Sequence, residues 1–269
     1  MTDRTTAQAP LPREHGAWGL LLQPFFAGAL LSGRWTWLLL PAAGLALSGF
    51  LLREPLTVVV RYRWLWRRGG PPLRAAERWA ALLFALLLVC LIVLLRNLPV
   101  TPLLALTATG AVLTGAAVAA AVRNLQRSVV FQAASAAGLC TTGLLAALVS
   151  TGGVPQWAWL LWAVLSAHAS ASILAVHARL DARAGRSARK AVRRAAWVAQ
   201  ALECGAALAA GRLAFPLVLS AVANTAELWR LRSPEALREP LTRVGFRTLA
   251  VALLHMAAAV FALWPAARG

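Results

Sequence analysis

The sequence predicts an all-α, polytopic integral membrane protein: a bundle of about nine transmembrane helices with a cytoplasmic N-terminus. Three observations predict this fold class. Only 13% of the 269 residues are charged, whereas a soluble domain carries about a quarter. Hydrophobic residues make up 60% of the chain, and the mean hydropathy is +0.67. The apolar residues form long runs without two-residue alternation, which favours helices over a barrel, and the basic residues gather in alternate loops.

The apolar runs set the number of helices. A spanning helix needs about 20 residues, and nine uncharged runs approach this length. They are 16–32, 35–52, 79–95, 100–122, 128–149, 156–178, 195–210, 213–230 and 248–264. The run 195–210 is the weakest, and the sequence leaves open whether 16–32 and 195–210 cross completely.

The chain is expected to form one transmembrane domain over residues 12–264. Residues 1–11 are polar and rich in Pro, Thr and Ala, so we expect a disordered tail without the apolar region of a cleaved signal peptide. Residues 265–269 are expected to be a short C-terminal tail. The three cysteines lie in separate runs without CxxC spacing, which indicates buried small residues: Cys90, Cys140 and Cys204.

The distribution of charge predicts the orientation. The N-terminal tail and the loops 53–78, 123–127, 179–194 and 230–247 hold 23 of the 27 Lys and Arg residues. These segments fall on one side of a nine-helix chain, and the positive-inside rule makes that side cytoplasmic. The net charge of +18 therefore faces the anionic membrane leaflet, and nucleic acid is not expected as a partner.

Two further patterns predict how segments are placed. Segments 100–122 and 128–149 are rich in Gly, Ala, Ser and Thr, which allow helix backbones to approach closely, so we expect both to be buried. The basic and aromatic sequence RYRWLWRR at 61–68 is typical of a segment that lies on the membrane surface.

The opening sequence, PREHGAWGLLLQPFFAG at 12–28, is the first candidate site. Glu14 and His15 stand at the mouth of an apolar helix, where ionisable groups suggest function. The helix is then interrupted by Gln23-Pro24, and Pro24 leaves the carbonyl of Leu20 without its usual partner. The alternative is an ordinary capped helix start, with Glu14 near the positive end of the helix dipole.

A short repeat supplies the second candidate site. The sequence REPLT occurs at 53–57 and again at 238–242. Arg53-Glu54 and Arg238-Glu239 are interpreted as a pair of cationic cradles that face one cytoplasmic mouth. Parallel capping is the alternative, because Arg-Glu-Pro can start a fresh helical turn.

Polar residues within the apolar runs supply the remaining candidates. Glu203 lies inside the run 195–210 near Gln200, and it either handles a proton or cation or makes a structural hydrogen bond. Asn224 and Glu227 are three residues apart and share one helix face. The basic run 179–194 is interpreted as a solvated loop.

Two histidines lie near the centres of their runs, and two facing imidazoles could ligate haem or a metal. A neutral histidine bonded to a neighbouring helix is the commoner arrangement in membranes. No metal site is therefore predicted, and His168 and His255 are kept as minor candidates.

The strings EHGAWGLLLQP and GFLLREPL resemble the YwiC-like family of bacterial integral membrane proteins. The resemblance covers roughly the first sixty residues and implies a membrane location without naming an activity. It marks as signature positions Glu14, His15, Gly16, Trp18, Pro24, Arg53, Glu54 and Pro55.

A second resemblance is architectural. Nine helices with long cytoplasmic loops after the second and sixth look like the UbiA-type prenyltransferases, which hold Mg²⁺ with Asp-rich motifs in those loops. Here the two loops contain only Asp181, and Asp3 is the only other aspartate of the chain. One aspartate cannot build two Mg²⁺ sites, so the usual metal-dependent chemistry is not expected.

The favoured hypothesis is an inner-membrane protein that binds or transports a small anionic or amphiphilic solute in a cytoplasm-facing polar cavity. The cavity is predicted to be lined by Glu14, His15, Gln23, Arg53, Glu54, Glu203, Arg238 and Glu239. A UbiA-like transferase with an isoprenoid-like ligand and a haem- or metal-binding subunit are the alternatives. No complete catalytic motif is present, and the sequence names no cofactor, solute or oligomeric state. Membrane lipid is the one partner expected in every case.

Overall fold

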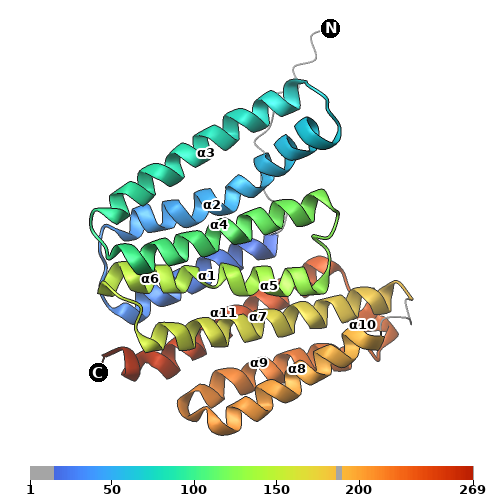
Figure 1. The fold of residues 1–269 in the computed structure, drawn as a ribbon. Helices are drawn as coiled ribbons and strands as arrows, with labels where there is room; N and C mark the ends of the chain where they lie inside the picture. Colours follow the sequence, from blue (N-terminus) through green and yellow to red (C-terminus); the bar gives the residue numbers. More distant parts are fainter. Residues whose placement is uncertain (1–14, 186–189, 269) are drawn as a thin grey trace.

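The structure is a computed structural model that describes residues 15–185 and 190–268, and all regular elements within these ranges are helical (Figure 1). Their bounds are α1 His15–Ser32, α2 Leu39–Val60, η1 Arg61–Leu65, α3 Pro71–Leu95, α4 Val100–Val122, α5 Val129–Leu139, α6 Thr142–Thr151, α7 Gln156–Arg183, α8 Lys190–Ala209, η3 Gly211–Leu213, α9 Ala214–Arg230, α10 Pro234–Arg238 and α11 Leu241–Arg268.

Each predicted apolar segment overlaps a helix, and 128–149 is divided between α5 and α6. The prediction of a loop over 53–78 is wrong for its first part, because α2 continues to Val60 and carries Arg53 and Glu54. Several helices continue beyond the uncharged run that predicted them: α7 ends at Arg183 and α11 begins at Leu241. Charged side chains reach the membrane interface from such extensions while the backbone stays helical. The expected C-terminal tail is likewise helical over residues 265–268, where Arg268 lies 4.6 Å from the ring centre of Trp264.

Successive long helices run in opposite directions, so their connections alternate between two ends of the bundle (Figure 1). The links α2–α3, α4–α5, α7–α8 and α9–α11 lie at one end. The links α1–α2, α3–α4, α6–α7 and α8–α9 lie at the other end with the C-terminus.

Six helical stretches in the described ranges are long and apolar enough to cross a membrane. They are 39–65, 71–95, 100–122, 129–151, 156–183 and 241–268. In α3 only 11% of the most apolar window is buried, and Leu82, Phe84 and Val89 are exposed. An apolar surface of this extent suits contact with lipid.

The prediction that 100–122 and 128–149 are both buried is right for one segment and wrong for the other. The most apolar window of 129–151 is 61% buried, but that of α4 is only 22% buried. Helix α4 packs chiefly against α2, and a Cβ atom at Gly110 or Gly115 would have no neighbouring atom within 4 Å. Small residues permit close packing but do not by themselves require it.

The centre of the bundle is the contact between α1 and α6. A Cβ atom at Gly28 would overlap the backbone oxygen of Gly143, and one at Gly143 would lie 2.9 Å from the carbonyl oxygen of Pro24. The hydroxyl of Thr142 donates to the carbonyl of Leu21, 2.7 Å away. These contacts place α6 against the turn that Pro24 weakens, so the proline promotes close packing between helices.

The basic and aromatic segment continues α2 as the π-helix η1. Trp64 is 76% exposed, and Arg61 donates to the carbonyl of Ala121, 2.5 Å away, at the end of α4. The exposed indole agrees with the predicted position at the membrane surface.

Candidate functional site

Three helices align polar side chains toward one another in the second half of the chain. The polar face of α7 carries His168, Ser172 and Arg179, whose spacings of four and seven residues place them on one side of the helix. The facing helices also carry polar side chains, which are Ser220, Asn224 and Glu227 on α9 and Arg247, Thr248 and His255 on α11.

At one end of this polar face lies a group that we call the charge cluster, formed by Arg179, Glu227, Glu239 and Arg247. Arg179 Nη1 is 3.1 Å from Glu227 Oε2, and its Nη2 is 3.1 Å from Glu239 Oε2. Arg247 also contacts both carboxylates: its Nη2 lies 2.9 Å from Glu227 Oε2 and its Nη1 lies 2.9 Å from Glu239 Oε1. The two arginines therefore neutralise the same two carboxylates and join α7, α9 and α11.

The burial of the charge cluster makes these ion pairs structurally important. The side chain of Arg179 is only 3% exposed, and its guanidinium also donates to the carbonyl of Ala236. A buried arginine without its carboxylates would be strongly destabilising. The hydrogen bonds from Arg247 hold the pKa of Glu239 below its ordinary value, so this carboxylate is charged at neutral pH.

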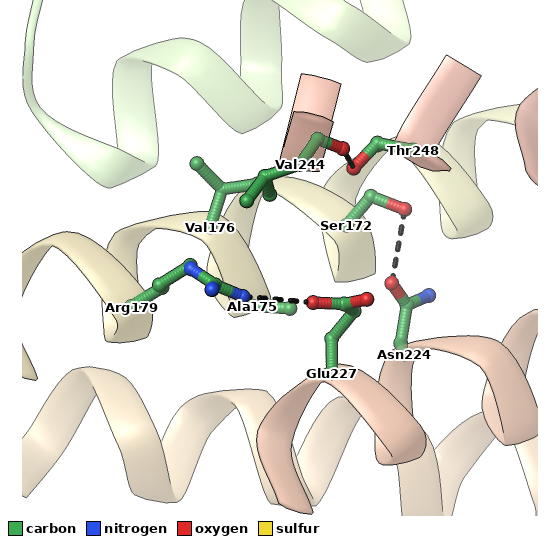
Figure 2. A pocket seen from close by; sticks show the side chains of 8 residues that line it. All are labelled: Ser172, Ala175, Val176, Arg179, Asn224, Glu227, Val244 and Thr248. Atoms are coloured by element: carbon green, nitrogen blue, oxygen red, sulfur yellow. Dashed lines mark hydrogen bonds and ion pairs between the residues drawn. The ribbon is translucent and has the colours of Figure 1, made fainter. Parts of the chain in front are cut away.

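A small pocket lies beside the charge cluster, between α7, α9 and α11 (Figure 2). It is lined by Ser172, Ala175, Val176, Arg179, Asn224, Glu227, Val244 and Thr248. Figure 2 shows Arg179 and Glu227 pointing toward each other and Ser172 bonded to Asn224. The cavity measures about 20 Å³, which is enough for one water molecule. Its lining combines charged and polar side chains with three apolar ones, Ala175, Val176 and Val244.

Deeper in the bundle, the polar contacts continue to Glu203 of α8. Ser220 Oγ donates to Glu203 Oε1, 3.0 Å away, and lies 2.8 Å from Nδ1 of His168. Asn224 Nδ2 donates to the same serine oxygen, 3.4 Å away. Because Asn224 also lines the pocket, hydrogen bonds connect the pocket with Glu203.

The two histidines stack instead of presenting nitrogens to a common point. The ring centres of His168 and His255 are 4.3 Å apart with an interplanar angle of 22°. The ring nitrogens of His255 face the backbone oxygens of Pro216 and Val164, at 3.0 and 3.4 Å. Within 15–185 and 190–268, no three His, Cys, Asp or Glu side chains form a group that could hold a metal ion. This geometry does not support the haem or metal hypothesis.

The predicted site residues fall into separate groups. Glu14 lies outside the described residues, and His15 is described only as the first residue of α1. Arg53 and Glu54 pair on α2 with 2.7 Å between Nη2 and Oε1, whereas Gln23 is half-buried on α1. The others lie in the second half of the chain, with Glu203 buried, Arg238 exposed and Glu239 in the charge cluster.

The two REPLT sequences have different structures. The second fits the expectation of a fresh helical turn, because α11 begins directly after Pro240. The expectation is wrong for the first, because Pro55 lies inside the uninterrupted helix α2. The oxygen of Arg53 accepts a hydrogen bond from Thr57 Oγ1 at 2.8 Å, so a side chain satisfies a carbonyl near the proline.

Arg179 and Arg247 are functional candidates that the sequence did not single out. Arg179 was assigned to a solvated loop, but α7 continues past it and buries it to 2% exposure. The common helical spacing of His168, Ser172 and Arg179 is the signal that indicates a shared buried face.

The comparisons with known proteins concern the first half of the chain. The model of a family described as YwiC-like protein matches residues 11–147, just over half of the chain. No curated protein and no solved structure matches significantly. The match includes Gln23, Arg53 and Glu54, while the charge cluster, the pocket and Glu203 lie beyond it. With the six apolar helices, it shows a multi-pass membrane protein, and the chain belongs to the YwiC-like family.

Proposed function

We propose that this protein lies in the bacterial cytoplasmic membrane and binds a small anionic or amphiphilic solute, or transports it across that membrane. The observation that carries the proposal is the pocket between α7, α9 and α11, whose lining combines Arg179 and Glu227 with Val176 and Val244. Soluble cores rarely bury arginine and glutamate together without a structural or functional reason, and membranes are still less tolerant of them.

The pocket suits an amphiphilic anion in particular. The guanidinium of Arg179 forms part of the lining, and its Nε atom is buried without a hydrogen-bond partner in the described part of the chain. An entering carboxylate or phosphate would compete with Glu227 for this guanidinium, while an apolar portion would contact Val176 and Val244. The entropic and electrostatic cost of opening the charge cluster would then be offset by the solute.

The present arrangement corresponds to a closed conformation. A cavity of about 20 Å³ admits water but no larger solute. Binding therefore requires α7, α9 and α11 to separate at the charge cluster, where Glu227 of α9 pairs with Arg179 of α7 and Arg247 of α11. We propose that breaking and remaking these pairs opens and closes the pocket, as expected for a two-state gate.

The proposed orientation places this gate at the cytoplasmic end. The nine apolar segments would then all cross the membrane, including α1, α8 and α9. The support is the accumulation of 23 of the 27 basic residues in alternate segments, together with the alternation of the connections between the two ends (Figure 1).

The candidate residues in the first half of the chain are proposed to lie at the same cytoplasmic end. The paired Arg53 and Glu54 of α2 lie in the half of that helix nearest the α2–α3 connection, and Arg53 lies 5.7 Å from the ring centre of Phe50. We propose that they, with Glu14, His15 and Gln23, guide solute toward the bundle. Arg53→Gln is then expected to weaken solute binding less than loss of a pocket residue.

A thermal-shift screen of the full-length protein in detergent tests the proposal. The probes are succinate, inorganic phosphate, lauric acid and geranylgeranyl phosphate. At least one probe is expected to raise the melting temperature of the wild type. Thr248→Val and Arg179→Gln are expected to abolish that shift, because both alter the pocket lining.

Arg243→Gln provides the matched control, since Arg243 is an exposed arginine one turn from Arg247 on α11. It removes the same charge and should leave the shift intact. The proposal is wrong if none of the four probes stabilises the wild type, or if the Thr248→Val variant responds as the wild type does.

A further inference from the structure

We propose that Glu203 is a proton-binding site inside the bundle, with Ser220 and His168 as its proton relay and Asn224 as its link to the pocket. The link to solute binding rests on the proposed function, whereas the proton site itself does not.

The surroundings of Glu203 indicate that it holds a proton. The residue is only 6% exposed, and within 15–185 and 190–268 its carboxyl group accepts one hydrogen bond, from Ser220. The other oxygen, Oε2, is buried and has no partner in the described part of the chain. A charged carboxylate needs more donors or a nearby cation in such a place, whereas a neutral acid does not.

Among the described residues, no arginine or lysine is paired with Glu203. On α7 and α11, Arg179 and Arg247 are each bonded to both Glu227 and Glu239. The groups that face Glu203 through Ser220 are the imidazole of His168 and, stacked behind it, that of His255. On α8 itself, Gln200 bonds the backbone of Ala196. Cys204 is exposed, so the prediction that all three cysteines are buried is wrong for this one.

Ser220 is placed to pass a proton between Glu203 and His168. Its oxygen lies 3.0 Å from Glu203 Oε1 and 2.8 Å from His168 Nδ1. The serine hydroxyl, which donates to Glu203 Oε1 in the structure, first rotates toward Nδ1 of His168. The protonated carboxyl group then gives its proton to the serine oxygen, and the serine gives its hydroxyl proton to Nδ1. Glu203 becomes a carboxylate, His168 becomes an imidazolium, and Ser220 is unchanged, so no proton is gained or lost.

The ring of His255 lies next to the proton-accepting ring of His168. The two ring centres are 4.3 Å apart. The ring of His255 is held in place by the backbone oxygens of Pro216 and Val164. Because Nε2 of His168 is buried and has no partner among the described residues, no other contact fixes its protonation.

Asn224 connects this proton site to the pocket. Its Nδ2 donates to the oxygen of Ser220, and its Oδ1 accepts from Ser172, 3.1 Å away. Both Asn224 and Ser172 line the pocket. A solute that bonds to Asn224 would therefore alter the hydrogen bond from Asn224 to Ser220, and the protonation state of Glu203 would reciprocally affect solute binding.

Infrared difference spectroscopy of the reconstituted full chain tests the proton site without any solute. Between acidic and alkaline buffer, the wild type is expected to show the C=O stretching band of a buried carboxylic acid. Glu203→Gln should remove this band, while the exposed control Glu235→Gln should retain it. The same band in Glu203→Gln would overturn the assignment.

Ser220→Ala keeps the test decisive if Glu203→Gln does not fold. It leaves the acid in place and removes its hydrogen-bond donor, so the band is expected to move to higher frequency. An unmoved band would show that the titrating acid is not the partner of Ser220.

The coupling is tested by measuring, as a function of pH, the affinity of whichever of the four probes stabilises the wild type. We expect an affinity that varies with pH in the wild type and is constant in Glu203→Gln. Equal pH dependence in both proteins would overturn the coupling. If no probe binds, the proposed function fails alone, and the infrared band still decides the proton site.

Discussion

Arg179 of α7 and Arg247 of α11 contact the same two carboxylates from different helices. Each guanidinium reaches both Glu227 and Glu239, so four charges balance within one partly buried cluster. In lipid the hydrophobic effect does not hold helices together, and polar contacts of this kind take over part of that role. The charge cluster therefore both stabilises one end of the bundle and restrains the pocket beside it.

Replacing Arg179 should test how much the charge cluster contributes to the free energy of unfolding. Arg179→Gln leaves two carboxylates with one arginine and is expected to destabilise the protein by about 3–5 kcal/mol, the range for breaking a buried ion pair. Arg243→Gln should stay within about 0.5 kcal/mol of the wild type, as exposed substitutions do. Thermal unfolding in detergent, followed by circular dichroism, measures both variants. Equal melting temperatures would show that the ion pairs contribute no stability.

The charge cluster should also make stability depend on acid pH. Hydrogen bonds from Arg247 hold the pKa of Glu239 below its ordinary value of 4.5. Because the folded pKa is the lower one, the stabilisation is complete above the unfolded pKa and is lost as pH falls through the folded pKa. The melting temperature of the wild type is therefore expected to fall as the pH decreases below 4.5.

Glu239→Gln should melt at a lower temperature at neutral pH and show a weaker acid dependence than the wild type. The exposed control Glu235→Gln should follow the wild-type curve. Parallel curves for wild type and Glu239→Gln would show that Glu239 does not contribute to the acid response.

The contact between α1 and α6 predicts a steric effect. Gly28→Ala places a methyl group against the backbone oxygen of Gly143, which cannot move aside as a side chain would. Overpacking of this kind costs about 1–3 kcal/mol. Gly110→Ala is the control, because nothing lies within 4 Å of a Cβ atom at that position on α4. Melting temperatures should fall for the first variant alone, and an equal response would argue against the close contact.

Cysteine labelling tests the proposed orientation and the number of crossings. In a cysteine-free background, Gly153→Cys and Arg212→Cys should react with a membrane-impermeant maleimide in intact spheroplasts. Leu125→Cys and Arg232→Cys should react only after the membrane is permeabilised. If the cysteines at positions 212 and 232 instead react from the same side, α9 does not cross the membrane. The reversed pattern at all four positions would place the N-terminus outside.

The sequence by itself determined the helical character of the described chain and the approximate positions of its helices. Segment 100–122 coincides with α4 because a helix in lipid must satisfy its own backbone groups, which a long apolar run reveals locally. The accumulation of arginine in alternate loops is equally local, and it supports an orientation without any knowledge of packing. Glu203 could be selected because a carboxylate in an apolar run is costly wherever its neighbours lie.

The tertiary structure alone decided which of these polar groups meet. Arg179 and Glu239 are 60 positions apart, and nothing in either neighbourhood specifies a partner. Likewise, the residues of α4 permitted close packing, but the arrangement of the other helices left one face exposed. The pairing of His168 with His255 depended on how α7 and α11 are rotated, which turned a suggested ligand pair into stacked rings. A local sequence pattern indicates that a polar group in lipid is energetically costly. Which partner offsets that cost depends on how distant helices pack against each other.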